Sequence, residues 1–297
     1  MPQQLASMPL LLLRLALVIL VVLVATVLLR RGKVSAAVRT AFLVGGVAVL
    51  GFAFGLFGPA SLDPNPVFAL RSFLRSAFGA APSVPPGAAA SGGGLAAAKL
   101  PVGALLGVML VVGLISNKGI CGWACQLGMA QDLLYRIKSP KLKPPFWLTN
   151  AIRIAAFALL IGGLAFAGLD WIGLVDPFQV FRLSFGAVTG IFIAIVLVAS
   201  IFIYRPWCQF LCPYGLVSWG LEQFSIMRPR IDRDICTGCK RCVRACPGHA
   251  MADIYAGKAI HADCFACGAC IAACLKQGAI GWRTAREGGM PHGNDRR

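Results

Sequence analysis

Two cysteine runs near the C-terminus determine how the rest of the chain is interpreted: 236-CTGCKRCVRACP-247 and 264-CFACGACIAACL-275. Both have the spacing Cys-x-x-Cys-x-x-Cys-x-x-x-Cys, and Gly238 and Gly268 aid close turns between neighbouring cysteines. Thiolates are soft ligands that suit iron–sulfur clusters, and three sulfurs in close turns converge on one cubane while the fourth reaches another. The two runs therefore predict two [4Fe–4S] clusters.

The spacing is that of a two-cluster bacterial ferredoxin, so we expect an α+β domain with crossed ligation. The first cluster would take Cys236, Cys239, Cys242 and Cys274, and the second would take Cys264, Cys267, Cys270 and Cys246. A structural zinc site is the alternative. It requires only two Cys-x-x-Cys pairs, which is fewer cysteines than two identical four-member runs contain.

The composition of the whole chain excludes a water-soluble single domain, because 58% of the 297 residues are hydrophobic and only 13% are charged. The net charge of +17 does not indicate nucleic-acid binding, since the basic residues lie between apolar stretches rather than on a polar face. Twelve cysteines in short repeated spacings, with no cleavable signal sequence, indicate metal ligands in a reducing compartment rather than disulfides.

Five apolar stretches are long enough to cross a bilayer as helices. They are 9–29, 41–57, 100–116, 147–168 and 187–204. The loops after the first and third stretches carry most of the basic residues, so the positive-inside rule makes these loops cytoplasmic. This orientation puts the N-terminus in the periplasm and everything after Tyr204 in the cytoplasm.

The chain then divides into four parts: an N-terminal helix with a basic loop (1–40), a membrane domain (41–227), the cluster domain (228–282) and a polar tail (283–297). Arg14 interrupts the first apolar stretch, and a charge there must snorkel or find a partner. We therefore expect the first helix to be peripheral to the main bundle. Residues 79–98, rich in Pro, Gly, Ala and Ser, resemble a flexible insertion.

The membrane domain contains an internal repeat. The segment 63-DPNPVFAL-70 matches 176-DPFQVFRL-183, and 118-KGICGWACQLG-128 matches 205-RPWCQFLCPYG-215. The repeat predicts two parallel helix pairs related by an axis along the membrane normal, which together form a four-helix bundle. Asp63 and Asp176 before proline are typical helix N-caps. The functional alternative is a role in releasing protons from a quinol.

Four further cysteines lie at the ends of the third and fifth stretches, so we expect them at the cytoplasmic membrane surface. They are Cys121, Cys125, Cys208 and Cys212. If each Cys-x-x-x-Cys continues as a helix, both sulfurs share one face; alternatively, a new helix starts at Pro213. Three interpretations compete: an additional metal or iron–sulfur centre, a redox-active dithiol system, and buried cysteines that only pack.

The stretches predicted to cross the membrane contain no histidine, because His249, His261 and His292 all lie later in the chain. A b-type haem held by paired histidines is therefore excluded. Few acids are available to accept protons from a quinol: Asp63, Asp132, Asp170, Asp176 and Glu222. A transport function would need more polar groups at the bilayer midplane.

Taken together, these motifs resemble the NapH/MauN group of ferredoxin-type membrane proteins, and the membrane and ferredoxin parts of the nitrous oxide reductase regulator NosR are similar. The resemblance covers about 41–282. It implies a bacterial inner-membrane protein that moves electrons from the quinone pool towards a periplasmic system, with a companion ferredoxin-type or cytochrome c subunit. Two features depart from the family pattern: Gln126 replaces a proline, and the N-terminal helix is extra.

Our leading hypothesis is an oxidoreductase subunit, a quinol dehydrogenase component rather than a complete enzyme, with two [4Fe–4S] clusters and no haem b. The alternative is an accessory protein that supplies electrons for the maturation or maintenance of a periplasmic metalloenzyme. A third hypothesis, a thiol or metal sensor, rests only on Cys121, Cys125, Cys208 and Cys212.

Overall fold

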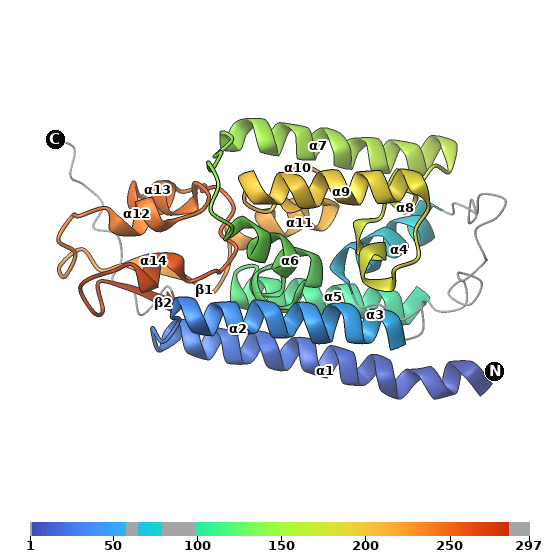
Figure 1. The fold of residues 1–297 in the computed structure, drawn as a ribbon, viewed down its shortest axis with the longest axis horizontal. Helices are drawn as coiled ribbons and strands as arrows, with labels where there is room; N and C mark the ends of the chain where they lie inside the picture. The colour runs from blue at the N-terminus through green and yellow to red at the C-terminus, as the bar shows by residue number, and fades with distance from the viewer. Residues whose placement is uncertain (1, 58–64, 79–98, 285–297) are drawn as a thin grey trace.

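The computed structural model describes residues 2–57, 65–78 and 99–284. The first Asp-Pro element at Asp63, the insertion at 79–98 and the tail from 285 onwards lie outside these residues. The long helices run side by side as a bundle, and residues 227–284, the C-terminal region, lie at one end of it (Figure 1). We call this end the C-terminal end and the opposite one the far end.

Five long helical stretches form the bundle within the described residues. They are α1 (Pro2–Arg30); α2 (Ala36–Gly46), continued by π-helical η1 (Val47–Ala53) and α3 (Phe54–Phe57); α5 (Lys99–Ser116); α7 (Phe146–Gly162), continued by π-helical η4 (Gly163–Ala167); and α9 (Ala187–Phe202). Apolar side chains such as Leu23, Val111 and Leu159 are exposed on their outer faces. Large exposed apolar surface of this kind fits contact with lipid.

Three of the five predicted crossings correspond to helices that are long and apolar enough to span a membrane: Leu12–Arg30, Ala36–Leu56 and Phe146–Ala167. A fourth qualifies only if Ala187–Phe202 is counted together with Trp171–Arg182, from which it is bent by 74°. The crossing predicted at 100–116 corresponds to α5, whose apolar part Gly103–Ser116 is shorter.

Short helices close the far end of the bundle: α4 (Pro66–Phe78), α8 (Trp171–Leu174) and the 3-10 helix η5 (Pro177–Arg182). The Asp176 carboxylate accepts a hydrogen bond from the Phe178 backbone N–H at 3.1 Å, with Pro177 at the first helical position. The capping interpretation is therefore confirmed for Asp176. Arg71 of α4 pairs with Asp170 at 2.9 Å and with Asp176 at 3.5 Å, which joins α4 to the other two helices.

Two pairs of short helices lie inside the bundle. They are η3 (Ile120–Ala124) with α6 (Gln126–Tyr135), and α10 (Pro206–Phe210) with α11 (Pro213–Glu222). The backbone is left-handed at Lys118 (φ 57°) and at Arg205 (φ 51°), where the chain leaves α5 and α9. At both places it turns back into the bundle and then returns to the C-terminal end.

We call these two helix pairs, at 120–135 and 206–222, the first and second re-entrant segments. Close contacts set their depth in the bundle. A Cβ on Gly51, near the far end of the apolar stretch Ala36–Leu56, would lie 3.5 Å from the Cβ of Gln126. The Tyr214 hydroxyl donates to the carbonyl of Met109, in the middle part of α5, at 3.1 Å. Both α6 and α11 therefore begin well inside the bundle, not at its surface.

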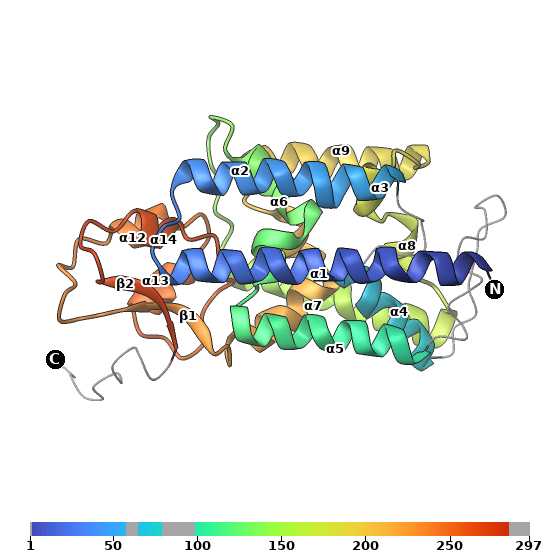
Figure 2. The ribbon, with the colours of Figure 1, turned by 90° about the horizontal axis from the view of Figure 1, so that it is seen from below.

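The first helix packs along the bundle rather than outside it, which corrects our expectation. Val18, Val22, Ala25 and Leu29 form a buried stripe on one face of α1. This stripe contacts η3 and, nearer the C-terminal end, the C-terminal region. Figure 2 shows α1 running the length of the bundle. Arg14 is only 4% exposed because α1 is packed against its neighbours there.

The C-terminal region combines a two-stranded antiparallel sheet with three short helices. The strands β1 (Met227–Ile231) and β2 (Ile280–Thr284) pair from Met227↔Thr284 to Ile231↔Ile280. The helices are α12 (Arg241–Ala245), α13 (Ala250–Tyr255) and α14 (Ala269–Ala272). The sheet therefore joins the two ends of the region and brackets both cysteine runs.

The bundle and the C-terminal region meet at a close contact that we call the junction, formed by Gly122, Trp123, Phe265 and Ala266. The Trp123 indole N–H donates to the Ala266 carbonyl at 2.8 Å. A Cβ on Gly122 would lie 2.4 Å from the Phe265 carbonyl oxygen, so only glycine fits there. One apolar core spans both parts, since Leu29 and Trp123 belong to the same buried cluster as Trp282.

We predict that Gly122→Ala destabilises the protein by about 1–3 kcal/mol, the usual cost of overpacking a tight contact. Gly107→Ala is the matched control, because nothing lies within 4 Å of its Cβ position in α5. It should be neutral or stabilise the helix by roughly 0.5–1 kcal/mol. The unfolding midpoints in detergent check this, and equal midpoints for the two variants would contradict the junction contact.

Candidate iron–sulfur and thiol site

The eight cysteines of the C-terminal region surround two separate hollows. One is lined by Cys236, Cys239, Cys242 and Cys274, and the other by Cys246, Cys264, Cys267 and Cys270. These are the same two sets as in the crossed ligand assignment, with one cysteine of each run lining the hollow of the other run. The donor set fits [4Fe–4S] clusters, because each hollow has four thiols and glycine or left-handed turns between them.

The same geometry is unfavourable for zinc. Within the described residues, no three His, Cys, Asp or Glu side chains are placed to hold a single metal ion. The turns that shape the hollows have positive φ at Gly238 (71°) and Gly268 (77°), as expected for the close turns predicted there. A Cβ on Gly268 would also lie 2.9 Å from the Leu29 side chain of α1, so this glycine serves the packing as well.

The two hollows differ in their surroundings. Cys239 in the first is exposed, whereas the second is walled by Tyr204, Phe265 and Trp282, all buried. Hydrogen bonds from the Arg241 backbone N–H and the Thr237 side chain lower the pKa of the Cys239 thiol. Burial, and then the charge of Glu222, raise the pKa of the Cys264 thiol. Metal loading at Cys264 must therefore release a proton.

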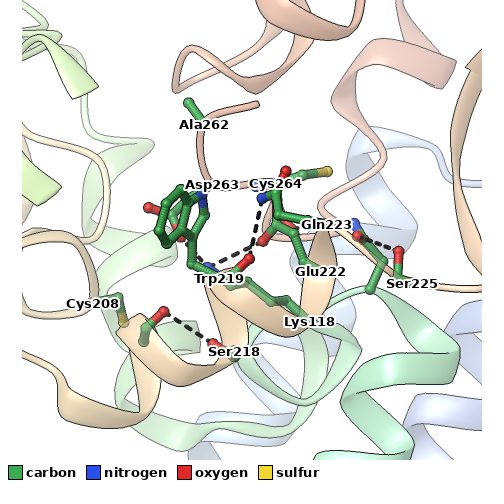
Figure 3. A network of polar contacts seen from close by, with 12 residues as sticks. Lys118, Cys208, Ser218, Trp219, Glu222, Gln223, Ser225, Ala262, Asp263 and Cys264 are labelled. Atoms are coloured by element: carbon green, nitrogen blue, oxygen red, sulfur yellow. Dashed lines mark hydrogen bonds and ion pairs between the residues drawn. The ribbon is translucent and has the colours of Figure 1, made fainter. Parts of the chain in front are cut away.

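A buried ionic network joins the second hollow to the bundle (Figure 3). The Lys118 ammonium, with a fully buried side chain, pairs with Glu222 at 3.1 Å and with Asp263. Glu222 also accepts the backbone N–H of Cys264 at 2.8 Å. Arg153 of α7 reaches Asp263 at 3.1 Å. Asp263, which precedes the predicted cluster ligand Cys264, is thus held by two cations, Lys118 and Arg153, from different parts of the bundle.

The charges in this network also fix ionisation states. Burial alone would raise the pKa of Asp263, but the charges of Lys118 and Arg153 outweigh burial and hold that pKa below its ordinary value. The imidazole Nδ1 of His261 lies 3.2 Å from Glu222. Burial alone would lower the pKa of His261, but its hydrogen bond to Glu222 raises it instead.

A second network clamps the first re-entrant segment. The carboxylate of Asp132 accepts hydrogen bonds from Arg39 at 2.8 Å, Arg205 at 2.9 Å and the Tyr204 hydroxyl at 3.1 Å. Both arginines also donate to the Gly122 carbonyl, and Arg205 donates to that of Cys121. Arg39 belongs to the basic loop by its place in the sequence, yet it is 3% exposed and lies 4.1 Å above the Trp123 ring.

The second re-entrant segment has a similar clamp. Arg153 donates to the carbonyl oxygens of Cys208 at 3.3 Å and Gly215 at 3.4 Å. A Cβ on Gly215 would lie 2.6 Å from the Cys208 carbonyl, and one on Gly128 would lie 2.8 Å from that of Cys121. The glycine that recurs in both motifs therefore allows the new helix to pass close to the preceding turn.

The four remaining cysteines, Cys121, Cys125, Cys208 and Cys212, are buried inside the bundle, which corrects the expected position at the membrane surface. We call them the bundle cysteines. Cys125 and Cys212 are the N-caps of α6 and α11, so a new helix does begin directly after each pair.

All four bundle cysteines belong to one buried apolar cluster. Polar groups of the protein face these sulfurs. For example, the Gly215 backbone N–H lies 3.3 Å from the Cys212 sulfur, and the Gln131 amide lies 3.9 Å from the Cys208 sulfur. Apart from such contacts, the thiols are surrounded by protein and shielded from water. Thiols enclosed in this way are inert towards reagents in solution.

The acids that we considered as proton acceptors all have other partners in the described residues. Asp132 and Glu222 neutralise buried cations, while Asp170 and Asp176 cap helices and pair with Arg71. Asp63 lies outside the described residues. Spacing alone could not identify the buried networks, because Lys118, Arg153 and Asp263 are far apart in the sequence.

Family models place iron–sulfur signatures in both parts of the chain. A model described as a 4Fe-4S dicluster domain matches residues 228–275. A second, described as a 4Fe-4S binding domain, matches twice, at 100–145 and 185–231. The second model therefore covers both segments that carry the bundle cysteines.

Curated relatives match at 26–29% identity. The ferredoxin-type protein NapH of Haemophilus influenzae is 26% identical over 201 residues, which is 62% of this chain and 70% of that protein. The methylamine utilization ferredoxin-type protein MauN of Methylobacillus flagellatus is 29% identical over 167 residues, 52% of this chain and 59% of that protein. YccM of Escherichia coli K12 is 26% identical over 190 residues, 57% of this chain.

The match to YccM spans about half of that protein's length, 52%. No solved structure matches this chain. The relatives nevertheless confirm the resemblance that the cysteine motifs predicted, and together with the family models they support a role in iron–sulfur electron transport.

We predict that Lys118→Met destabilises the protein by about 3–5 kcal/mol, because it leaves two buried carboxylates without their shared cation. Lys258→Met is the control: Lys258 pairs with Asp253 but its side chain is 61% exposed. It should cost no more than about 1 kcal/mol. Unfolding midpoints in detergent, measured at one pH, test this. Similar losses in both variants would show that the Lys118 network contributes little.

We also predict that single cysteine-to-serine variants reveal the crossed ligation by the cluster that each of them loses. Cys274→Ser should lose the same cluster as Cys236→Ser, and Cys246→Ser the same cluster as Cys267→Ser. Each variant should retain about four of eight irons. Iron content and EPR spectra of the reduced, anaerobically purified protein check the pairing. Matching spectra for Cys274→Ser and Cys267→Ser would rule out crossed ligation.

Proposed function

We propose, from the premise of a ferredoxin-type iron–sulfur electron-transport protein, that this chain is the quinol dehydrogenase component of a membrane redox system with a periplasmic partner. The observation that carries the proposal is the junction. It brings the segment of Cys121 and Cys125 against the loop that supplies Cys264 and Cys267, through the contact of Gly122 with Phe265. Thiols buried among membrane helices thus lie next to the predicted cluster ligands.

Clusters held by the two cysteine sets would supply one-electron chemistry. The chain's own residues prepare the route to them. Phe265 is 5% exposed and packs on Tyr204 with ring centroids 5.8 Å apart, so it keeps water out of the junction. Lys118 and Arg205 lie 5.1 and 5.2 Å from the Phe265 ring. Their positive charges favour the arrival of an electron at the junction.

The cytoplasmic location of the C-terminal region is part of the proposal. The basic loops that favour the cytoplasm lie at the C-terminal end: Lys143 donates to the Cys246 carbonyl at 2.7 Å, and a Cβ on Gly32 would lie 3.9 Å from Ile271. The positive-inside rule then puts this end in the cytoplasm and the N-terminus of α1 in the periplasm of a bacterial inner membrane.

We further infer that the membrane part arose by duplication of a helix pair, to which α1 was added. The support is the set of matching features in the two halves: left-handed Lys118 and Arg205, N-caps at Cys125 and Cys212, and the close glycines of both motifs. The family model that matches at 100–145 and again at 185–231 agrees with this.

Quinol should reduce the clusters of the purified protein. The protein is prepared anaerobically, its clusters are oxidised, a reduced quinol analogue is added, and cluster reduction is followed by EPR. In Cys121→Ser, quinol-dependent reduction should be lost or at least about tenfold slower, because this change alters the bundle cysteine that directly precedes Gly122 of the junction. Reduction of Cys121→Ser by dithionite is the control that its clusters are intact.

Two outcomes would contradict the proposal. If the wild type holds about eight irons and quinol does not reduce them, the accessory role in maturing a metalloenzyme is favoured. In that case, deletion should leave the terminal enzyme present but without its cofactor. If deletion changes transcription without affecting electron flux, the sensor hypothesis is favoured.

A further inference from the structure

The first cysteine hollow is open to the outside, and the residues that line it all belong to the C-terminal region. Its Cys239 is the only exposed one of the twelve cysteines. The helix α12, which begins next to this hollow, lies in the part of the C-terminal region that is turned away from the bundle (Figures 1 and 2). The second hollow is instead walled by Tyr204 of the bundle. A molecule in solution can therefore approach the first hollow most closely.

The two hollows also differ in charge. Lys240, Arg241 and Lys276 line the first, whose described lining contains no acid. The second is lined by one charged side chain among the described residues, the carboxylate of Asp263. All three cations of the first hollow are exposed, and within the described residues their side chains form no ion pair. Of the two nearby acids that precede Cys236, Asp232 already pairs with Arg283 at 3.4 Å and Asp234 is exposed.

The two cysteine runs align residue by residue, so each is a control for the other. Between its second and third cysteines the first run has Lys240 and Arg241, where the second run has Gly268 and Ala269. Two positions after its last cysteine the second run has Lys276, where the first has a glycine. Cations needed only to balance a cluster's negative charge would be expected at both hollows. Their restriction to the exposed hollow indicates a role towards something outside the protein.

An exposed apolar side chain lies among these cations. Leu275 lines the same hollow and is 68% exposed, and it stands where the first run has Pro247. An apolar centre with a charged rim is the usual composition of a protein–protein interface. We call Lys240, Arg241, Leu275 and Lys276, together with the exposed Cys239, the basic face. Because this face is turned away from the bundle, a soluble protein reaches it more readily than the lipid around the helices does.

We propose that the basic face docks a small acidic one-electron carrier protein in the cytoplasm. Carboxylates around the carrier's redox centre would meet the three cations, and contact over Leu275 would exclude water between the two proteins. The exchange is a single electron, lost by the reduced carrier and gained by this protein, and no bond or proton is transferred. The inference adds a cytoplasmic partner to the periplasmic one proposed above. It rests on the clusters and on the cytoplasmic position of the C-terminal end, not on the oxidation of quinol.

The first test measures binding to the full-length protein with its clusters, in a neutral detergent. The probe is an acidic plant-type [2Fe–2S] ferredoxin, and calorimetry gives its dissociation constant. The variant Lys240→Gln/Arg241→Gln/Lys276→Gln should raise this constant at low salt at least about tenfold, because charge complementarity across the interface is lost. Binding to the wild type should weaken as salt rises, since the screening length falls from about 10 Å at 0.1 M to about 3 Å at 1 M.

The matched control is Arg31→Gln/Lys33→Gln/Lys138→Gln, which removes three exposed cations from the basic loops next to the bundle. Its net charge equals that of the basic-face variant, so a general attraction between a basic and an acidic protein would affect both equally. The control should bind ferredoxin as the wild type does, and both variants should hold about eight irons. Equal weakening in the two variants, or no binding to the wild type, would overturn the proposal.

The second test maps the contact by acetylation of lysines followed by mass spectrometry. Bound ferredoxin should protect Lys240 and Lys276, whereas Lys258, whose side chain is 61% exposed, should react as before. The same labelling is repeated without ferredoxin, in nanodiscs rich in phosphatidylglycerol, where both lysines should remain reactive. Protection by this anionic lipid alone would assign the basic face to the membrane surface and overturn the docking of a carrier.

Electron exchange is followed by EPR after reduced ferredoxin, freed of dithionite, is mixed with the oxidised protein. The wild type should be reduced faster than the basic-face variant, and binding without reduction would overturn the role as a carrier site. None of these measurements uses quinol. Ferredoxin binding and exchange without quinol-dependent reduction would therefore support the docking site and contradict the quinol dehydrogenase function, while the opposite pair of results would overturn the docking site alone.

Discussion

The salt bridge of Lys118 with Glu222 and Asp263 is the interaction on which the rest of the structure depends. Each partner comes from a different part: Lys118 from the turn after α5, Glu222 from the end of α11, and Asp263 from the loop before Cys264. Because all three side chains are buried, any arrangement that separates them leaves a charge without a partner in a low-dielectric interior. The network thus specifies one way for the C-terminal region to sit on the bundle, whatever its net contribution to stability.

The need to give every buried polar group a partner also explains why the re-entrant segments are tolerated inside a membrane protein. Turns leave backbone carbonyls without helical partners, and such groups must be satisfied by protein where lipid surrounds them. Arg39 and Arg205 satisfy the carbonyls around Cys121 and Gly122, and Arg153 those of Cys208 and Gly215. Asp132 pairs with Arg39 and Arg205, and Asp263 pairs with Arg153. The bundle cysteines can therefore occupy the interior because ion pairs hold the irregular backbone around them.

Local patterns predicted much of this architecture, because the long helices follow from apolar length and the cluster ligands from cysteine spacing. The depth of the bundle cysteines did not follow, since Ile120–Ala124 is equally compatible with a surface turn and with a turn buried among helices. Arg14 led us to expect a peripheral helix, because a charge in an apolar stretch usually avoids burial, yet packing around α1 buries it. Asp132 and Arg205 are 73 residues apart, and no local pattern reveals a pairing over that distance.

The position of the second hollow against the bundle also constrains how the protein is assembled. The chain is made from its N-terminus, so the membrane helices are inserted before Cys236 and Cys264 leave the ribosome. Tyr204 of the bundle lines that hollow, and Glu222 holds the backbone of Cys264. Once the C-terminal region has docked, Cys264 and Cys267 are partly buried, which narrows their access to iron donors. We therefore expect the maturation machinery to work at the membrane on an undocked C-terminal region, with docking as the last step of biogenesis.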